Sequence, residues 1–571
     1  MPPTVSDTAP PAAPAAASPT VLTRPVRYHA DGGAVLEHLT RAGLLRTAER
    51  PVDCGDGPGV RPVDCVLLES ADITTKASRT TIAVLEASAR LTCWGGTVTA
   101  EALGAVDGQG LGADGIAALA RLEKRLGEHV IDRSPGRLTL VLPTSADDDP
   151  TIEERERLTA LSTIEPLRVL AQAEVDHPHL PLGAGAFAFD YLSTFESLPE
   201  VAQGANACPD YLFYDARIIL VVDHPTQEAT LVGASVDAAD LERRLDALAA
   251  AIDAATDEGT SSNGTQPVTA PPAGSRLLHA VPTASDADFE AVVGMMRGHI
   301  ADGDVYQVVP SRGFTIACPD TLAAYHVLRH ANPSPYMFYV AASDFELFGA
   351  SPESALLHSA RTGRVAIRPI AGTRPRGLHP DGTVDHERDT RLELELRTDA
   401  KEVAEHVMLV DLARNDVARV SRPGTRSVQD LLRVDRYSRV MHLVSEVSGE
   451  LADDLDALDA FRASMTMGTL TGAPKLRAAE LIRQAEGVRR GSYGGSVGYI
   501  RGDGELDTCI VIRSGFVTNG TALVQAGAGI VAASSPAAEA AETVHKARAV
   551  LEAVAAAQGA TLVIDTTGKE A

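Results

Sequence analysis

The sequence predicts an α+β protein in which antiparallel strands are flanked by long helices. Two long helical patterns support this class, one over residues 398–420 and one that begins at Ser535-Pro536. Elsewhere, short runs of β-branched and apolar residues alternate with helical stretches and end at glycine, proline or polar turns. A chain of 571 residues is long enough for about two to four domains, each with a hydrophobic core.

An N-terminal region, residues 26–255, is predicted to follow a disordered Pro- and Ala-rich tail of residues 1–25. The tail lacks the basic start and apolar core of a signal peptide. Helical patterns predict helices over residues 31–46, 115–126, 152–173 and 236–254. β-Rich runs predict strands over residues 62–70, 80–85, 89–94, 216–222 and 229–232. Residues 86–88 separate two of these runs, which we expect to form neighbouring antiparallel strands.

Residues 256–280 are rich in Gly, Ser, Thr and Pro and predict a linker. A second region would then span residues 281–558, followed by a short tail of residues 559–571. In the second region, helices are expected over residues 286–301 and 321–330, and strands over residues 305–309, 336–340, 345–348 and 365–370. The runs 336–340 and 345–348 would form a hairpin.

The composition excludes several classes of function. Lys and Arg number 51 against 77 Asp and Glu, a net charge of −26, which argues against binding to nucleic acid or to an anionic membrane surface. We expect no membrane span, because no apolar run approaches 18 residues. The six cysteines show neither C-x-x-C nor zinc spacing, which is typical of reduced thiols in a cytoplasmic protein.

The helix over residues 398–420 carries two acidic residues inside an apolar pattern. Its apolar residues wrap most of the way round the helix, which predicts burial on most sides. Glu402 and Glu405 are three residues apart, so their carboxylates lie about one turn apart on one face. Two buried carboxylates repel, so one is protonated or a cation such as Mg²⁺ lies between them. The alternative is an ordinary helix, capped by Asp399 and with a Lys401–Glu405 ion pair.

A second acidic face is predicted on the helix that begins at Ser535-Pro536. Glu539, Glu542 and Lys546 share this face, and apolar residues occupy the opposite one. The alternative is a solvated face with a Glu542–Lys546 ion pair. Two acidic couples in one region suggest a metal site without specifying it.

Seven motifs together resemble the chorismate-utilising enzymes, above all the large subunits of anthranilate synthases. They lie at residues 306–312, 332–338, 369–374, 402–416, 468–475, 491–495 and 525–529. The resemblance covers nearly all of residues 285–555 and is fainter before residue 250, where Leu67-Leu-Glu-Ser70 is the firmest match. It implies antiparallel, sandwich-like sheets flanked by helices.

The resemblance implies a site for chorismate and Mg²⁺. Glu405 and Glu542 would ligate the ion, with Glu402 and Glu539 in or just behind its coordination shell. The residues implied in substrate binding are Gly372, Thr373, Tyr493, Arg513, Gly527, Ala528, Gly529 and Lys546. Arg513 lies in an apolar strand and suits bidentate recognition of a carboxylate, although a structural ion pair is the alternative.

Three further residues are implied in the chemistry: Glu353, His442 and Thr469. Glu353 would protonate the departing 4-hydroxyl group of chorismate as ammonia adds, so its carboxyl must stay protonated near neutral pH. His442 would assist the loss of the enolpyruvyl side chain as pyruvate. A histidine in an apolar segment can instead be a hydrogen-bonded core residue.

Two departures from related enzymes indicate an anthranilate-forming activity. Enzymes that add water carry a lysine base where this chain has Gln307, and an amide cannot deprotonate water. Aminodeoxychorismate synthases typically have a lysine at the position of Ala371, so an amine-dependent route to a 4-amino product lacks its nucleophile.

The ammonia is expected to come from a separate glutamine amidotransferase subunit. Glutamine hydrolysis needs a nucleophilic cysteine at a sharp strand-to-helix turn, and no cysteine has that context. Cys54 in Val-Asp-Cys-Gly-Asp comes nearest, but without the surrounding apolar strand and helix.

Feedback inhibition by L-tryptophan is also implied. By resemblance the effector site comprises Ser70, Pro335, Tyr336 and Met337. A packed strand edge beside a Pro-rich turn is the structural alternative. Two rival functions stay open: a synthase that stops at 2-amino-2-deoxyisochorismate in a secondary-metabolite pathway, and a catalytically silent tryptophan-binding regulatory protein.

Overall fold

The computed structural model describes residues 18–566, apart from residues 51–58, 72–77, 105, 107–109, 145–151, 173–174, 256–275, 380–382 and 438–439. Cys54, most of the predicted linker and most of the predicted N-terminal tail lie outside the described residues. Within the described part, none of the helices combines the length and the apolar character needed to cross a membrane.

In the first half of the chain, strands outnumber helices. The strands are β1 (Thr20–Val26), β2 (Thr47–Glu49), β3 (Val60–Pro62), β4 (Cys65–Ala71), β5 (Ser78–Trp94), β6 (Thr97–Ala102), β7 (Val130–Ser134), β8 (Arg137–Val141), β9 (Leu182–Phe187), β10 (Tyr211–Asp223) and β11 (Glu228–Ser235). The helices are α1 (Gly32–Arg41), α2 (Ala113–Leu126), α3 (Glu154–Thr159), α4 (Glu165–Ala171) and α5 (Ala238–Ala254), with short 3₁₀ turns at Gly127–His129 and Phe189–Thr194.

The second half adds longer helices. Its strands are β12 (Leu277–Pro282), β13 (Gln307–Val308), β14 (Ser311–Ala317), β15 (Tyr336–Ala341), β16 (Glu346–Ser351), β17 (Ser354–Ser359), β18 (Arg364–Ile367), β19 (Ile370–Pro375), β20 (Ser427–Arg436), β21 (Val440–Glu450), β22 (Gly472–Ala473), β23 (Ser496–Arg501), β24 (Leu506–Ile510), β25 (Ser514–Thr518), β26 (Thr521–Gly527) and β27 (Thr561–Ile564). Its helices are α6 (Asp286–Ala301), α7 (Thr321–Ala331), α8 (His386–Thr398), α9 (Ala400–Val420), α10 (Ala457–Ser464), α11 (Gly468–Thr471), α12 (Lys475–Glu486) and α13 (Pro536–Ala557).

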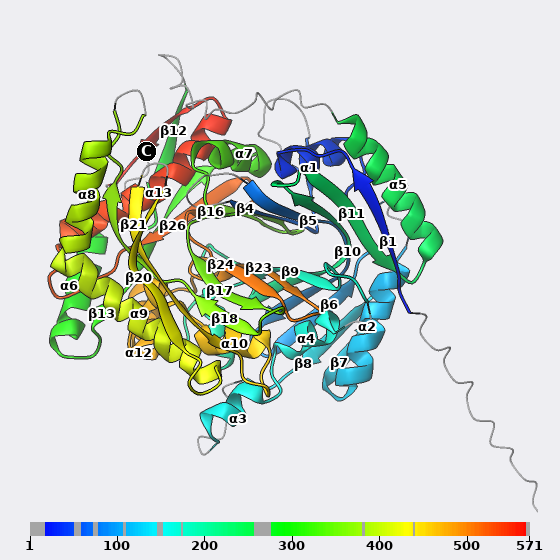
Figure 1. Ribbon diagram of the computed structural model, residues 1–571, viewed down its shortest axis with the longest axis horizontal. Helices are drawn as coiled ribbons and strands as arrows, with labels where there is room; N and C mark the ends of the chain where they lie inside the picture. Colours follow the sequence, from blue (N-terminus) through cyan, green and yellow to red (C-terminus); the bar gives the residue numbers. More distant parts are fainter. Residues whose placement is uncertain are drawn as a thin grey trace, which may run out of the picture.

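Most of the described strands form one continuous network of 23 strands with helices packed around it (Figure 1), and β2 with β3 and β13 with β22 form two separate pairs. The pairing is antiparallel almost throughout, as predicted, and β12 with β27 is a parallel pair. Strands from the two predicted regions join directly, since β15 pairs with β4 and β9 pairs with β23. The predicted boundary therefore divides the sequence but not the sheet.

The ends of the predicted segments differ from the structure. β1 begins at Thr20, inside the predicted N-terminal tail, and β27 (Thr561–Ile564) lies inside the predicted C-terminal tail. β12 lies partly inside the predicted linker. Each of these strands gains its partner from a distant part of the chain, β1 from β11 and β12 from β27, which no local pattern reveals.

Several predicted elements are wrong in detail. The two strands expected around residues 86–88 are one strand, β5, which passes these residues through register shifts against β10. The helix expected over residues 152–173 is broken into α3 and α4, and Pro166 lies in the first turn of α4. β9 has no counterpart among the predictions, because its Gly- and Ala-rich sequence has low strand propensity.

α9 is buried along one face, not on most sides as predicted. Its buried residues include Leu409, Ala413 and Val417, and this face packs on β19, β21 and α10. Val407, on the outer side, is 46 % exposed. An acidic helix of this kind can therefore carry carboxylates at the edge of its buried face.

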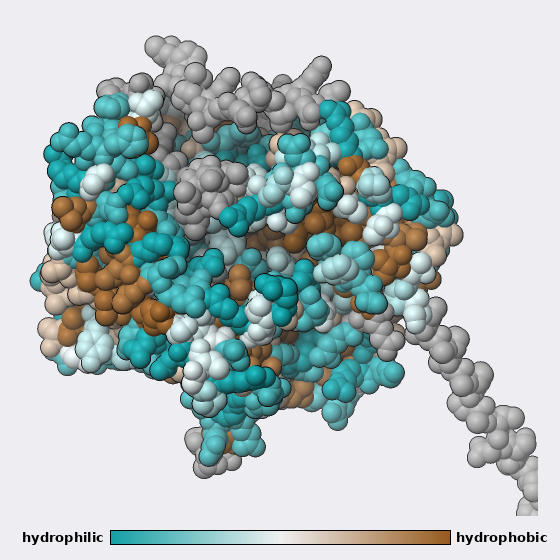
Figure 2. All heavy atoms as spheres, viewed as in Figure 1, coloured by the Kyte–Doolittle hydropathy of each residue, from teal (hydrophilic) through white to brown (hydrophobic). Residues whose placement is uncertain are grey.

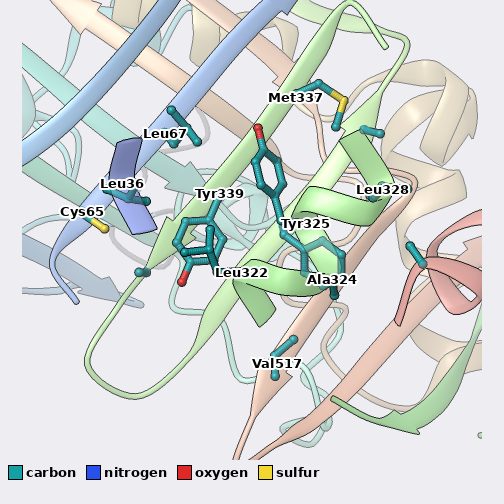
Figure 3. Close-up of a cluster of buried hydrophobic side chains, with 14 of the residues drawn as sticks. Leu36, Cys65, Leu67, Leu322, Ala324, Tyr325, Leu328, Met337, Tyr339 and Val517 are labelled. Carbon is teal, nitrogen blue, oxygen red and sulfur yellow. The ribbon is translucent and has the colours of Figure 1, made fainter. Parts of the chain in front are cut away.

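One hydrophobic core cluster joins the two regions (Figure 3). Leu322, Tyr325 and Leu328 of α7 meet Tyr339 of β15 and Leu67 of β4 there. Each of these buried aliphatic and aromatic side chains contributes roughly 1.5–3 kcal/mol to folding. On the face in Figure 2, hydrophilic residues cover most of the surface and apolar residues gather in separate patches, as expected for a chain with net charge −26.

Candidate active site

The first acidic couple projects from the N-terminal end of α9. Asp399 caps this helix by accepting hydrogen bonds from the backbone N–H groups of Lys401 (2.9 Å) and Glu402 (3.2 Å), as one of the alternatives predicted. Glu402 accepts a hydrogen bond from Arg374 of β19 (3.0 Å). Glu405 accepts one from the side-chain amide of Gln307 of β13 (3.0 Å). The two carboxylates therefore face inward, toward strands that carry other predicted site residues.

The second acidic couple projects from the first two turns of α13. Glu539 is only 5 % exposed, so the predicted alternative of a solvated face is wrong for this residue. Glu542 forms the expected ion pair with Lys546 (2.7 Å). The Lys546 ammonium also donates to the backbone carbonyl of Gly527 (3.0 Å), which ties this face of α13 to the end of β26.

The carboxylates of α9 and α13 act on one another electrostatically. Burial raises the pKa of Glu405, and the negative charges of Glu402 and Glu542 raise it further. Burial also raises the pKa of Glu539, and the charge of Glu542 adds to this. Burial opposes ionisation of Glu542 as well, but the Lys546 ammonium holds its pKa below the usual range. Two helices separated by about a hundred residues of sequence thus place four acids in one neighbourhood.

Two glycines allow the α9 acids to approach the backbone. A Cβ atom at Gly372, which has a φ of +75°, would lie 3.1 Å from an oxygen of Glu402. A Cβ atom at Gly529 would lie 3.3 Å from an oxygen of Glu405 and 2.6 Å from the Gln307 amide nitrogen. Any side chain at either glycine would therefore crowd a carboxylate.

The donor set fits a hard divalent cation. Carboxylate oxygens are the ligands that Mg²⁺ prefers. Burial raises the pKa values of Glu405 and Glu539, and the negative charge of neighbouring carboxylates, which a cation would relieve, raises them further. Among the described residues, no three Asp, Glu, His or Cys side chains already form a complete metal cluster. Arg374 and Lys546 currently neutralise Glu402 and Glu542, so ligation requires these carboxylates to exchange partners.

Glu353 is a buried acid that stays protonated at neutral pH. It lies between β16 and β17 and is 6 % exposed. Burial raises its pKa to about 8, although the Thr469 hydroxyl and the backbone of Ile370 partly offset this. Arg513 and Lys546 also act on this carboxyl, which places it beside the acidic cluster. A protonated carboxyl in such a setting can donate a proton.

His442 is held in one tautomer by the turn at Gly372. Its Nδ1 lies 3.2 Å from the Gly372 carbonyl oxygen and 3.0 Å from the Thr373 hydroxyl. Because a carbonyl oxygen only accepts, Nδ1 carries the proton and Nε2 presents a lone pair. Burial lowers the pKa of His442 to about 4, so the ring is neutral above that pH. It can then accept a proton.

Arg513 presents an unpaired guanidinium group. Within the described part of the chain it forms no ion pair, so the predicted alternative of a structural salt bridge is wrong. Its backbone has a φ of +51°, an uncommon conformation for a residue with a side chain. Burial lowers its pKa, and the nearby Tyr493, Glu542 and Glu353 act in the opposite direction. The guanidinium is available to an anionic ligand.

Tyr493 and the 527–529 backbone lie on the same side as Arg513. The Tyr493 hydroxyl is 3.0 Å from the position of a Cβ atom at Gly527, and burial raises its pKa to about 12, so it is a neutral donor. The N–H group of Ala528 is already bonded to the Pro310 carbonyl (3.1 Å). Of the predicted backbone contacts, Ala528 therefore cannot donate to a substrate unless that bond breaks.

The predicted effector residues lie on two paired strands, apart from Pro335, which immediately precedes β15. Ser70 of β4 is directly opposite Tyr336 of β15, and the Tyr336 hydroxyl donates to Asp507 (3.2 Å). Met337 points to the other face of β15 and joins the core cluster in Figure 3. The backbone carbonyl of Pro335 accepts from Ala71 (3.0 Å). Tyr336 and Met337 thus face opposite sides, and the effector site stays a prediction.

Arg374 had no role in the predictions. It pairs with both Glu402 and Asp399, so it is the main counter-charge at the start of α9. Its position two residues after Gly372 was the available signal, because residues two apart on a strand lie on one face of the sheet.

Comparison with known proteins defines the class of this fold and site. A family model described as chorismate binding enzyme matches residues 138–552. The chain therefore belongs to the chorismate binding enzymes. It is 46 % identical to anthranilate synthase component 1 of Escherichia coli, covering 92 % of this chain and 98 % of that protein. It is 48 % identical to the component 1 of Vibrio parahaemolyticus, covering 86 % and 88 %.

A solved structure agrees with this placement. Anthranilate synthase component I from Streptococcus pneumoniae superposes with a TM-score of 0.63 at 28 % identity, covering 83 % of this chain and 92 % of that one. Within the chorismate binding enzymes, the chain is a member of the anthranilate synthase component 1 family.

Proposed function

We propose that the chain is the large subunit of an anthranilate synthase, which converts chorismate and ammonia to anthranilate, pyruvate and water in the first step of tryptophan biosynthesis. One observation carries this proposal: carboxylates of α9 and α13 converge beside Glu353, His442 and the unpaired Arg513. Chorismate is a dianion with a hydroxyl leaving group, so its site needs cationic charge, an acid and a base.

Substrate placement follows from the charges around the site. Glu405 and Glu542 would hold Mg²⁺ and Glu402 and Glu539 would support them. The bound ion supplies positive charge to the ring carboxylate of chorismate. Arg513 and the Tyr493 hydroxyl would take the other carboxylate, with Gly372, Thr373, Gly529 and Lys546 close to the ring.

The first step adds ammonia at ring carbon 2 while the 4-hydroxyl group leaves as water. Glu353 supplies the proton to that hydroxyl, because its carboxyl is protonated at neutral pH, and Thr469 lies close enough to that carboxyl to act on its pKa. The side-chain oxygen of Gln307 is buried and has no hydrogen-bond partner among the described residues. It can accept an N–H of ammonia, whereas an amide cannot deprotonate water.

The second step removes the enolpyruvyl side chain. Nε2 of His442 takes the proton from ring carbon 2, and the electron pair of that C–H bond enters the ring as the C–O bond to the side chain breaks. The enolpyruvyl group takes up a proton and leaves as pyruvate, and the ring becomes aromatic. The neutral imidazole is the form that this step requires.

Ammonia is proposed to come from glutamine through a partner amidotransferase subunit. The five described cysteines, Cys65, Cys93, Cys208, Cys318 and Cys509, are all free and buried. Burial raises the pKa of each of these thiols, which opposes nucleophilic activity. Free thiols also support a cytoplasmic location.

The experiment that tests this function is product identification with the purified chain. With chorismate, Mg²⁺ and ammonium we expect equal amounts of anthranilate and pyruvate, and with glutamine in place of ammonium we expect neither. Accumulation of 2-amino-2-deoxyisochorismate alone would favour the rival synthase. A chain that binds tryptophan but leaves chorismate unchanged would be a regulatory protein.

The pH dependence of the reaction should follow the ionisation of the Glu353 carboxyl. Because the pKa of this carboxyl is about 8, the proton it donates is present below that pH and is lost above it. With free ammonia held constant, kcat/KM should fall as the pH rises through 8. Glu353→Gln should lower kcat by about 10²–10⁴-fold and remove this limb of the profile. A profile unchanged in Glu353→Gln would assign the proton to another group.

Feedback inhibition should depend on Ser70. We expect Ser70→Arg to place a long cationic side chain against Tyr336, its cross-strand neighbour, and to fill the proposed tryptophan slot. The inhibition constant for tryptophan should rise at least about tenfold, while uninhibited activity changes by less than about twofold. Thr20→Arg on the exposed start of β1 is the control. Unchanged inhibition in Ser70→Arg would place the effector elsewhere.

A further inference from the structure

His406 is a fully buried polar residue of α9 with no role in the proposed reaction. It follows Glu405 directly, lies one turn after Glu402 and is 0 % exposed. Its Nε2 is 2.7 Å from the hydroxyl oxygen of Ser445 on β21. Its Nδ1 has no hydrogen-bond partner among the described residues. A buried ring with one unpaired nitrogen costs stability relative to an apolar side chain, so packing alone does not account for a histidine here.

The Ser445 hydroxyl joins three elements around the site. Besides His406, it accepts the backbone N–H of Leu432 in β20 (3.0 Å). β20 shifts register against β21 between Gln429 and Arg433, so this N–H falls outside the regular ladder. The backbone N–H of Ser445 donates to the carbonyl of Pro369 (3.3 Å), immediately before β19. One buried hydroxyl therefore links α9 and β20, and its residue links them to the strand that carries Gly372 and Thr373.

This junction lies on the same strand as His442. Ser445 is the third residue after His442 on β21, and β19 pairs with this part of the strand, with Ile370 opposite Val444 and Thr373 opposite His442. The side chain of His406 points from α9 into this sheet. Glu405, the preceding residue, points about 100° away around the helix, toward Gln307 and Gly529.

We propose that His406 and Ser445 are positioning residues, which fix the turn of α9 that carries Glu402 and Glu405 against the strand that carries His442. The inference rests on the proposed function, in which Glu405 ligates Mg²⁺. Ligand oxygens must be held within about 0.5 Å to bind such an ion well. The buried hydrogen bond restrains this turn of α9 against β21.

The test is the Mg²⁺ affinity of matched variants. His406→Leu and Ser445→Ala both remove the hydrogen bond, and His406→Gln keeps a donor nitrogen near the position of Nε2. Affinity is measured by calorimetric titration with Mg²⁺ and by electron paramagnetic resonance with Mn²⁺, neither of which depends on turnover. We expect the first two variants to bind about tenfold more weakly and His406→Gln to stay within about threefold of wild type.

Val417→Ala is the control for general loosening of α9, because Val417 is fully buried on the same helix far from the acids. We expect it to lower the melting temperature without changing the Mg²⁺ affinity. The kcat of Ser445→Ala at saturating Mg²⁺ should return to within about threefold of wild type, since the reacting groups are intact. If His406→Leu does not fold, Ser445→Ala, which deletes a single oxygen, carries the test.

Two results would overturn the inference and are distinguishable. If Ser445→Ala and His406→Leu have a lower melting temperature but the same Mg²⁺ affinity as Val417→Ala, His406 is a structural residue only. If the wild-type chain binds neither ion and forms no anthranilate, the proposed function fails and the inference fails with it.

Discussion

Replacing Glu405 or Glu542 by glutamine should abolish Mg²⁺-dependent conversion of chorismate, with kcat/KM falling by at least about 10³-fold, equivalent to about 4 kcal/mol of transition-state stabilisation. Each substitution keeps the shape of the side chain and removes one of the charged oxygens proposed to hold the ion. Steady-state assays with chorismate, ammonium and a range of Mg²⁺ concentrations measure the effect.

Glu405→Gln should lose activity but should not lose thermal stability. The folded-state pKa of Glu405 is raised by burial and by the charges of Glu402 and Glu542, so its ionised form is disfavoured in the folded protein. At neutral pH, Glu405→Gln removes this unfavourable charge, and its melting temperature in the absence of Mg²⁺ should equal or exceed that of wild type. Such a variant loses activity without losing the fold.

Two exposed acids provide matched controls. Asp411 lies further along α9 and pairs with Arg414, and Glu552 lies further along α13 beside Arg548. Asp411→Asn and Glu552→Gln should keep wild-type activity within about twofold, because surface ion pairs contribute little. Equal losses in the controls and in Glu405→Gln would contradict a metal site at the acidic cluster.

Replacing His442 by asparagine should separate the two chemical steps. The asparagine side-chain nitrogen can take the place of Nδ1 and donate to the Gly372 carbonyl, but nothing replaces the lone pair at Nε2. We expect amination to continue within about tenfold of wild type, while anthranilate formation falls by about 10²–10⁴-fold. 2-Amino-2-deoxyisochorismate should then accumulate, as measured by liquid chromatography and mass spectrometry.

His358 is the control for this substitution. It is also buried, and its Nδ1 is bonded to the Gly504 carbonyl (2.7 Å), outside the candidate site. His358→Asn should leave the ratio of the two products unchanged. If His442→Asn instead loses both steps equally, the histidine serves binding or the first step, and another base must complete the reaction.

The acidic faces of the site were readable from sequence because helical periodicity alone sets them. The spacing of Glu402 and Glu405, and of Glu539 and Glu542, places each pair about one turn apart on helices that the apolar pattern already predicts. Their joint effect on the pKa of Glu405 was not readable from this spacing, because it depends on how α9 and α13 approach each other in space.

The contacts that define the site are tertiary and could not be predicted from the sequence. The bonds from Gln307 to Glu405 and from Arg374 to Glu402 join strands to a helix across about 100 and 28 residues of chain. The left-handed backbone of Arg513 has no local signal, since glycine or asparagine is the usual residue there. The break before α4 did have a local signal, Pro166. Proline is tolerated in the first turn of a helix, where Pro166 lies, and not in its interior, so one unbroken helix over residues 152–173 was excluded by the sequence.

The most direct test of the central claim is to locate the divalent ion itself. Crystals of the chain grown with Mn²⁺ in place of Mg²⁺ allow the ion to be placed by its anomalous scattering, independently of any activity. We expect one site bounded by Glu405 and Glu542, with Lys546 displaced from its ion pair with Glu542. A manganese peak elsewhere, with Glu405 and Glu542 still bonded to Gln307 and Lys546, would contradict it.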